Sequence, residues 1–239
     1  MSKLSEVDFP MRMAAGKDSV YSSVNKFGRG AAIGAAIEDV WDPGGTWVEP
    51  PVAQLHTLVS TAAGDTQAVQ IEGVDTNWDL QSEAVTLTGT TPVNTANSYL
   101  RVFRVYNNDT TTFAGTITIA ALIAGTTQAQ ILVPNNQTLM AIYAVPNAFE
   151  ASVTQLWAAI GGASAAGVKV DISLWTRKVN KVWRIQHFTG IIDDGTSHFT
   201  HKFDPPLYAP QKTDIKVTAT PDKAATDISA GFDLILGPQ

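Results

Sequence analysis

The stretch that most constrains the fold of this chain runs from Gly167 to Phe188. Apolar and polar residues alternate from Val168 to Leu174, and this period of two places one row of side chains in a core and the other in water. The polar run 177–181 follows, and a second apolar run then continues to Phe188. Two strands joined by so short a polar run pair most simply as an antiparallel hairpin.

Short β-type runs separated by turn residues recur from Leu55 to Leu236, a spacing that is typical of a sandwich or barrel. Residues 150–160 fit both a helix and a strand, and we favour a strand because both neighbouring runs are strands. The run 227–236 carries its apolar residues on one face, which indicates a central strand. Because long helices and long crossovers are missing, we predict an all-β fold, an antiparallel β-sandwich that is jelly-roll-like.

Residues 1–51 differ from the rest of the chain. The glycine- and alanine-rich stretch 27–37 and the Pro-Gly turn 43–45 interrupt regular structure. We therefore predict an extended N-terminal arm over residues 1–51 and one β-sandwich domain over residues 52–239. The aromatic side chains of the arm need a surface, which is either their own domain or a neighbouring subunit. These candidate interaction residues are Tyr21, Phe27, Trp41 and Trp47.

Composition excludes several classes of protein. The 239 residues include no cysteine, so disulfides, thiolate zinc sites and thiol catalysis are ruled out. The net charge of -6, without a lysine or arginine cluster, argues against nucleic acid as a partner. We expect neither a signal peptide nor a membrane span, and hence retention in a cytoplasm. Charged residues make up only 16%, which indicates that much of the surface contacts other protein.

The candidates for catalysis or metal binding are few. His198 and His201, close to the acidic run 193–194 and to Asp204, are the best of them. Residues three apart in a strand point to opposite faces, so these two histidines would not converge on one ion. Asp193, Asp194 and Gly195 fit a turn instead. Since no phosphate-binding loop, nucleophile elbow or dinucleotide fingerprint is present, we predict no catalytic residue, no metal, no cofactor and no enzymatic activity.

One group of aromatic and basic residues suggests a binding surface. Trp175 and Arg177 lie on the first arm of the hairpin, and Trp183 and Arg184 open the second. An exposed tryptophan beside an arginine can bind a sugar or a partner protein. In the alternative interpretation, the tryptophans merely cover the edge of the sandwich.

Three segments of the chain resemble a family of structural proteins from tailed bacteriophages. They are VQIEGVDTNWDLQSEAVTLTGTTPVNTANSYLRVFRV (69–105), NNQTLMAIYAVPNA (135–148) and KTDIKVTATPDKAATDISAGFDLILG (212–237). The resemblance is one of strand sequences and not of a catalytic signature. It implies a virion component that is assembled in the host cytoplasm.

The resemblance does not fix which part of the virion this protein forms. Among virion proteins, a capsid cement or decoration protein that binds across capsomers fits best, as a homotrimer on the major capsid protein or another virion protein. The alternatives are a neck, tail or fibre protein, and a carbohydrate-binding module for host adhesion that uses Trp175 and Trp183. A phage enzyme has the least support.

Overall fold

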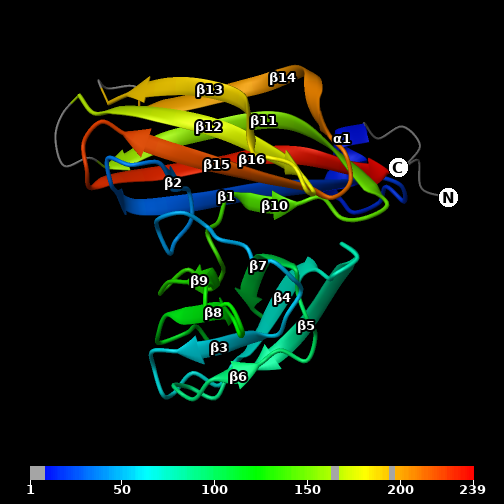
Figure 1. Cartoon of the computed structure of the whole chain (residues 1–239), viewed down its shortest axis with the longest axis vertical. Helices are drawn as coiled ribbons and strands as arrows, with labels where there is room; N and C mark the ends of the chain where they lie inside the picture. The colour runs from blue at the N-terminus through cyan, green and yellow to red at the C-terminus, as the bar shows by residue number, and fades with distance from the viewer. Residues whose placement is uncertain (1–8, 163–166, 194–196) are drawn as a thin grey trace.

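The computed structural model describes residues 9–162, 167–193 and 197–239. As predicted, the fold is all-β and antiparallel, and helix α1 (Phe9–Ala14) is the one helix among the described residues. Figure 1 shows two units, a larger sandwich and a smaller β unit beneath it. No helix formed by the described residues is long and apolar enough to cross a membrane.

The larger unit is a jelly roll of two facing sheets. The first sheet has the order β1 (Ser22–Ile33), β16 (Thr226–Pro238), β11 (Phe149–Gly162) and β14 (His198–Ala209). The second has the order β10 (Ile142–Ala144), β15 (Thr213–Pro221), β12 (Lys169–Lys178) and β13 (Arg184–Ile192). If these eight strands are numbered in chain order, the sheets read 1-8-3-6 and 2-7-4-5. This is the double Greek-key order of a jelly roll.

The second strand of the jelly roll is split into two pieces. The short strand β2 (Glu38–Asp39) and strand β10 both pair with β15, β2 at Thr218 and Ala219 and β10 between Asp214 and Lys216. Between the two pieces the chain leaves the sandwich and later returns. At the point of exit and return, which we call the neck, the Ala141 amide donates to the Val40 carbonyl at 2.9 Å. Residues 42–139 form the smaller β unit, here named the inserted unit.

The inserted unit has two small antiparallel sheets of its own. One contains β6 (Val93–Asn94), β3 (His56–Ser60), β8 (Ile117–Ala121) and β9 (Thr127–Ile131). The other contains β5 (Leu80–Thr86), β4 (Ala68–Val74) and β7 (Arg101–Asn107). Fully buried side chains such as Leu58, Ile71 and Ile119 form a second core between these sheets. The chain from residue 52 to residue 239 therefore forms two units and not the single sandwich that we predicted. The sequence did not reveal the boundary, because the strands of both units have the same local pattern.

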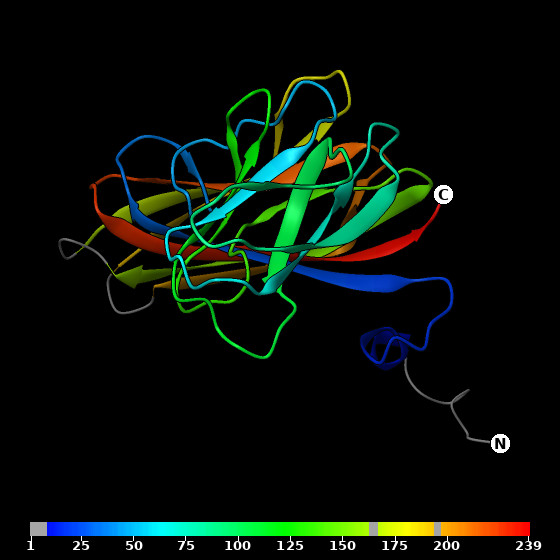
Figure 2. The ribbon, with the colours of Figure 1, turned by 90° about the horizontal axis from the view of Figure 1, so that it is seen from below.

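Residues 22–33 differ from the predicted extended arm. They form β1, which pairs antiparallel with β16 from Ser22 opposite Leu236 to Ile33 opposite Thr226. Figure 2 shows β1 as a long blue strand lying along the sandwich. The glycines that suggested interrupted structure are in fact required by packing. A Cβ atom at Gly28 would lie 2.1 Å from the Val40 carbonyl oxygen and 2.5 Å from the Ala141 nitrogen.

Other strand predictions are confirmed. The hairpin of the opening stretch is β12 and β13, residues 150–160 lie in strand β11, and β16 is central between β1 and β11. Strand β14 continues through the two prolines 205–206 to Ala209. Proline is tolerated there because β14 is an edge strand, where a missing N–H donor removes no ladder hydrogen bond on the open side.

We predict that Gly28→Ala destabilises the protein by ~1–3 kcal/mol or more, because the methyl group would collide with the backbone of the neck rather than with a movable side chain. Urea denaturation measures the loss. Gly162→Ala is the control, since a Cβ atom there meets nothing within 4 Å. Equal stability of the two variants would show that the neck can move away from β1.

Candidate functional site

A cluster of charged side chains joins the inserted unit to the jelly roll. Asp214 on β15 accepts hydrogen bonds from Arg101 of the inserted unit, at 3.0 Å from Nε and 3.2 Å from a terminal nitrogen. Its second oxygen lies 2.6 Å from Arg177 on β12. Arg177 in turn lies 2.5 Å from Glu49. Because Asp214 is 1% exposed, this carboxylate holds two guanidinium groups from different units where water cannot replace them.

A further ion pair, between Lys216 and Asp39, extends this cluster. The Lys216 ammonium lies 2.9 Å from one oxygen of Asp39 and 3.0 Å from the other, and the Trp47 amide donates to the same carboxylate at 2.7 Å. Burial raises the pKa of Asp39, although Lys216 and the Trp47 amide both favour the ionised form. The cluster therefore contains acids and bases held in pairs, as buried charges require.

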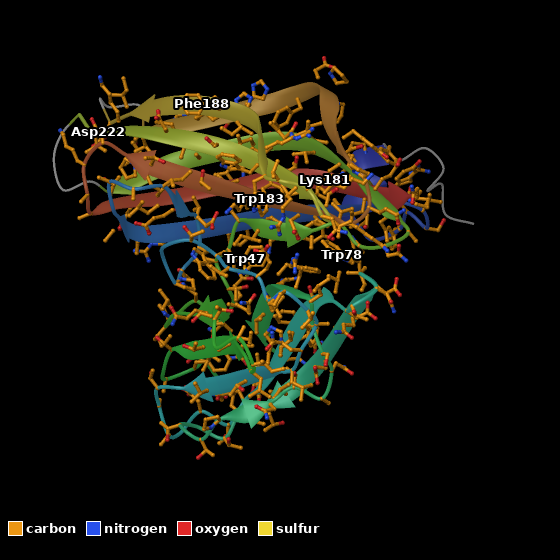
Figure 3. The ribbon with its side chains drawn as sticks, viewed as in Figure 1. Trp47, Trp78, Lys181, Trp183, Phe188 and Asp222 are labelled. Atoms are coloured by element: carbon orange, nitrogen blue, oxygen red, sulfur yellow. The ribbon has the colours of Figure 1, made fainter. Side chains whose placement is uncertain are left out.

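Tryptophan rings pack against the cations of the charged cluster, and Figure 3 labels three of these residues, Trp47, Trp78 and Trp183. The Arg101 guanidinium lies 5.8 Å from the centre of Trp47 and 5.2 Å from that of Trp78. Trp183 lies 4.5 Å from the Arg177 guanidinium and 4.7 Å from the Lys216 ammonium. Through these cation–π contacts, Trp183 covers the ion pairs at the junction and so has a structural role.

The structure brings together three of the four hairpin residues predicted to form a binding surface. Trp175 and Trp183 line a depression of about 160 Å³ next to Lys216 and Thr218. The Trp175 indole N–H donates to the Thr218 hydroxyl at 2.9 Å. Arg177 contacts Trp183 but points into the ion cluster rather than into solvent, and the fourth residue, Arg184, is an exposed residue at the start of β13.

The aromatic residues of the predicted arm contact their own chain. Trp41, just before the inserted unit, and Trp47 within it are each 3% exposed and belong to the second core. These two tryptophans therefore pack on their own chain rather than on a neighbouring subunit. Phe27 on β1 is half-buried. Tyr21 is 43% exposed and makes an edge contact with Phe9 of α1 at 5.5 Å between ring centres. Of these residues, only Tyr21 offers a largely open side chain to a partner.

The histidines form a pair that the sequence did not suggest. His187 on β13 and His201 on β14 stack with ring centres 4.2 Å apart, and Phe199 and Phe203 contact them. Burial, and then the neighbouring His201, lower the pKa of His187. His198 is exposed and does not join this pair. Among the described residues no group of three possible ligands could hold a metal ion, and the predicted turn 193–195 lies largely outside these residues.

An irregularity in the β12–β13 hairpin changes which side chains of β13 face outward. His187 pairs with Leu174 and Ile185 pairs with Trp175, so Gln186 is an extra residue in β13. Leu174 belongs to the core, and its neighbour Trp175 therefore faces outward. Because cross-strand partners share a face, the bulge places Ile185 on the outer face as well.

The outer face of β13 carries an exposed row of apolar side chains. Ile185 is 49% exposed, Phe188 58% and Ile192 44%, and Val182 just before the strand is 72% exposed. Figure 3 shows Phe188 on the side of the jelly roll away from the inserted unit. We call these four residues the β13 apolar row. Periodicity alone missed it, because the bulge shifts the alternation by one residue.

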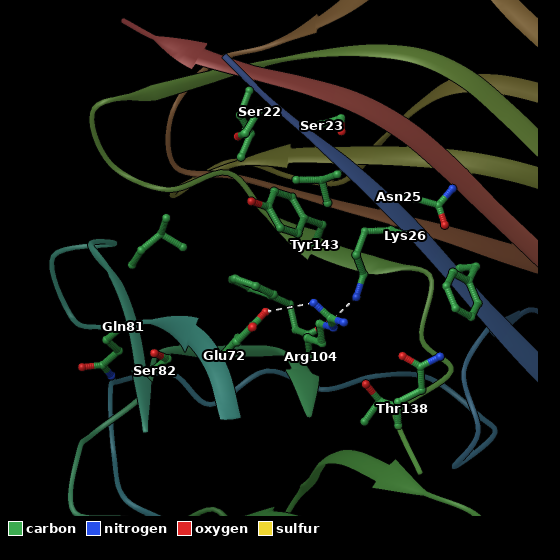
Figure 4. Close-up of a pocket in the computed structure, with 16 residues that line it drawn as sticks. Ser22, Ser23, Asn25, Lys26, Glu72, Gln81, Ser82, Arg104, Thr138 and Tyr143 are labelled. Atoms are coloured by element: carbon green, nitrogen blue, oxygen red, sulfur yellow. Dashed lines mark hydrogen bonds and ion pairs between the residues drawn. The ribbon is translucent and has the colours of Figure 1, made fainter. Parts of the chain in front are cut away.

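A cleft with a volume of about 630 Å³ lies between the two units. Strand β1 lines one side, and strands β4, β5 and β7 of the inserted unit line the other. Lys26, which lies in the segment predicted to be an arm, reaches into it (Figure 4). Sequence reasoning missed this site because a single lysine in a glycine-rich segment has no recognisable pattern.

Comparison with known proteins adds little. No family model matches the chain, and no curated protein matches it. One solved structure, "Structure of infectious bursal disease virus Gt strain", is similar over 97% of this chain and 78% of that chain, with 10% sequence identity and a TM-score of 0.24. A similarity of this size carries no argument, so function must be argued from the residues themselves.

We predict that Asp214→Asn lowers the free energy of unfolding by ~3–5 kcal/mol, because the buried Arg101 loses its counter-charge and Arg177 keeps only Glu49. Asp227→Asn is the matched control, because its pair with Arg29 is 3.4 Å long and 42% exposed on both sides, so the expected loss is ~0–1 kcal/mol. Urea denaturation of both variants gives the comparison. Equal losses would mean that the cluster does not hold the two units together.

Proposed function

We propose that this chain is a structural protein of a virion, and that within the particle it serves as a capsid cement or decoration protein of a tailed bacteriophage. The jelly-roll topology supports the first part, because this architecture recurs in viral capsid proteins, although lectins and cupins share it. The resemblance of three segments to phage structural proteins supports a tailed bacteriophage as the source of the virion. Fold alone does not assign function, so the proposal depends on a surface.

The observation that carries the proposal is the β13 apolar row. Its side chains lie on an edge strand, where exposed apolar area and unpaired backbone groups together favour contact with another chain. Strand β13 contains no proline, and Arg184 is its one residue with a permanent charge. Edge strand β14, in contrast, carries prolines 205–206 as well as Lys202 and Asp204. The β14 edge is thus protected against pairing, whereas the β13 edge is not.

The proposed partners follow from this surface. We expect the β13 apolar row to be buried against the major capsid protein, another virion protein or a second copy of this chain, with a homotrimer as the favoured assembly. The proposal includes no catalytic activity, no cofactor and no nucleic-acid partner. Its location is the virion, after assembly in the host cytoplasm.

The copy number in the virion separates the proposed function from its nearest rival. A cement protein repeats over the whole capsid surface, so we expect it to be present in numbers comparable with those of the capsomers. A neck, tail or fibre protein would be present in far fewer copies. Quantitative gel analysis of purified particles measures the ratio. Absence of the protein from the particle would contradict both the cement role and the neck, tail or fibre role.

We predict that Phe188→Asp weakens attachment to particles by about tenfold or more, because a side chain whose burial is worth ~1.5–3 kcal/mol is replaced by a charge. Sedimentation of particles with added protein measures attachment. The control is Ile123→Asp, since Ile123 is 82% exposed but lies in the inserted unit. Unchanged attachment of a folded Phe188→Asp variant, or an equal loss in both variants, would contradict the assignment of β13 as the attachment surface.

A carbohydrate-binding module is the second candidate. The depression between Trp175 and Trp183 favours it, because aromatic side chains beside polar groups are a common surface for sugars. The contacts of Trp183 with Arg177 and Lys216 count against it, since cations already cover part of the ring. Specific binding of the isolated protein to a glycan array, lost in Trp175→Ala, would favour this candidate over a purely structural role.

A further inference from the structure

Lys26 is a buried cation that has no counter-ion in the part of the chain that the structure describes. It is 6% exposed, and its ammonium donates a hydrogen bond to the backbone carbonyl of Phe103. Among the described residues, no carboxylate oxygen lies within 4.0 Å of this ammonium. An ammonium group has three N–H donors, so one is used and two are left. Buried charges are normally paired, which makes Lys26 an exception that needs an explanation.

The other charged groups around the cleft leave an excess positive charge. Arg104 on β7 lies 3.7 Å from Glu72 on β4, and both side chains are partly exposed. The Glu72 carboxylate is therefore already paired with Arg104 (Figure 4). Two cations and one anion face the cleft, so one positive charge is not balanced.

The cleft has the size and the lining of a small-molecule site. Its volume of about 630 Å³ lies within the ordinary range for ligand pockets. Ser22, Ser82 and Thr138 contribute hydroxyl groups, and Tyr143 points into the same space (Figure 4). The rings of Tyr143 and Phe103, with centres 4.8 Å apart, provide an apolar wall.

We propose that this cleft binds a carboxylate, which forms an ion pair with Lys26 while the surrounding hydroxyl groups bind the rest of the ligand. A group with one negative charge matches the single unbalanced positive charge. A doubly charged phosphate would be repelled by Glu72, which lines the same cleft. The carboxylate has two possible sources, a free organic acid or an acidic side chain of a peptide. This inference is independent of the proposed virion function.

The protonation state of Lys26 links binding to pH. Burial, and next the charge of Arg104, lower the pKa of Lys26 to about 7, while Glu72 acts in the opposite direction. Burial also raises the pKa of Tyr143, so this phenol stays neutral across the same range. A carboxylate binds the ammonium form. Affinity should therefore be constant between the pKa of the carboxylate ligand and that of Lys26, and fall as the pH rises through the pKa of Lys26.

Titration of the full chain with acetate, followed by two-dimensional NMR, tests the site. We expect amide shifts that cluster at Ser82, Thr138 and Tyr143, and much smaller shifts with acetamide, which has the same shape without the charge. N-acetylglutamate amide and N-acetylglutamine amide form the corresponding pair for a peptide source. Tighter binding of the blocked glutamate than of acetate would indicate a peptide, and equal binding a free acid. Shifts scattered over the surface, or equal effects of acetamide, would overturn the proposal.

Variants assign the effect to Lys26. We expect Lys26→Met, which keeps the length of the side chain, to weaken acetate binding by about tenfold or more and to abolish the dependence on pH. Lys202→Met is the matched control, because Lys202 is an exposed lysine on β14. Glu72→Gln should strengthen binding at a pH well below the pKa of Lys26, where the ammonium stays protonated, because it removes the competing carboxylate.

Thermal melting confirms that each variant is folded, and Lys26→Met should fold because it removes a buried charge. Wild-type affinity in a folded Lys26→Met variant would overturn the proposal.

Discussion

The arrangement of the two units depends on the carboxylate of Asp214. It lies on β15, the strand to which both pieces of the split second strand are attached, and it binds one arginine from each unit. Arg101 approaches with two nitrogens, which fixes the direction of its guanidinium as well as its distance. Because this contact is buried, the inserted unit is held in one orientation at the end of its neck.

That orientation also determines the cleft. Strand β1 passes the neck at Gly28, and Lys26, two residues earlier, faces the same side of the strand. The close approach at Gly28 thus brings the Lys26 side chain against β7 of the inserted unit, where it reaches the Phe103 carbonyl. The two cationic regions differ in one respect. Arg101 and Arg177 share an acid, whereas Lys26 has none among the described residues, and this difference distinguishes a structural contact from a candidate binding site.

The two open edges of the jelly roll are also unequal. Strand β14 carries charges and two prolines, and strand β13 carries exposed apolar side chains, of which Ile185 is turned outward by a bulge. Both strands contribute a histidine to the stacked pair 187 and 201, so the edges lie close together at this end of the sandwich. Assembly through β13 would leave the inserted unit, on the far side of the jelly roll, free for other contacts.

The sequence by itself determined the fold class. Alternation from Val168 to Leu174, the polar turn after it and the apolar face of the last run predict an antiparallel sandwich, because period-two burial needs only local information. Only the tertiary structure decided which sheet covers each strand. The glycines of β1 read as interruptions until the neck was seen to cross Gly28, and the strands of the inserted unit read as part of one sandwich. The sites at Asp214 and Lys26 likewise combine residues distant in the chain. The partners of these charges are set by long-range packing. A local sequence pattern predicts that a face is buried, but it does not predict which residues cover that face.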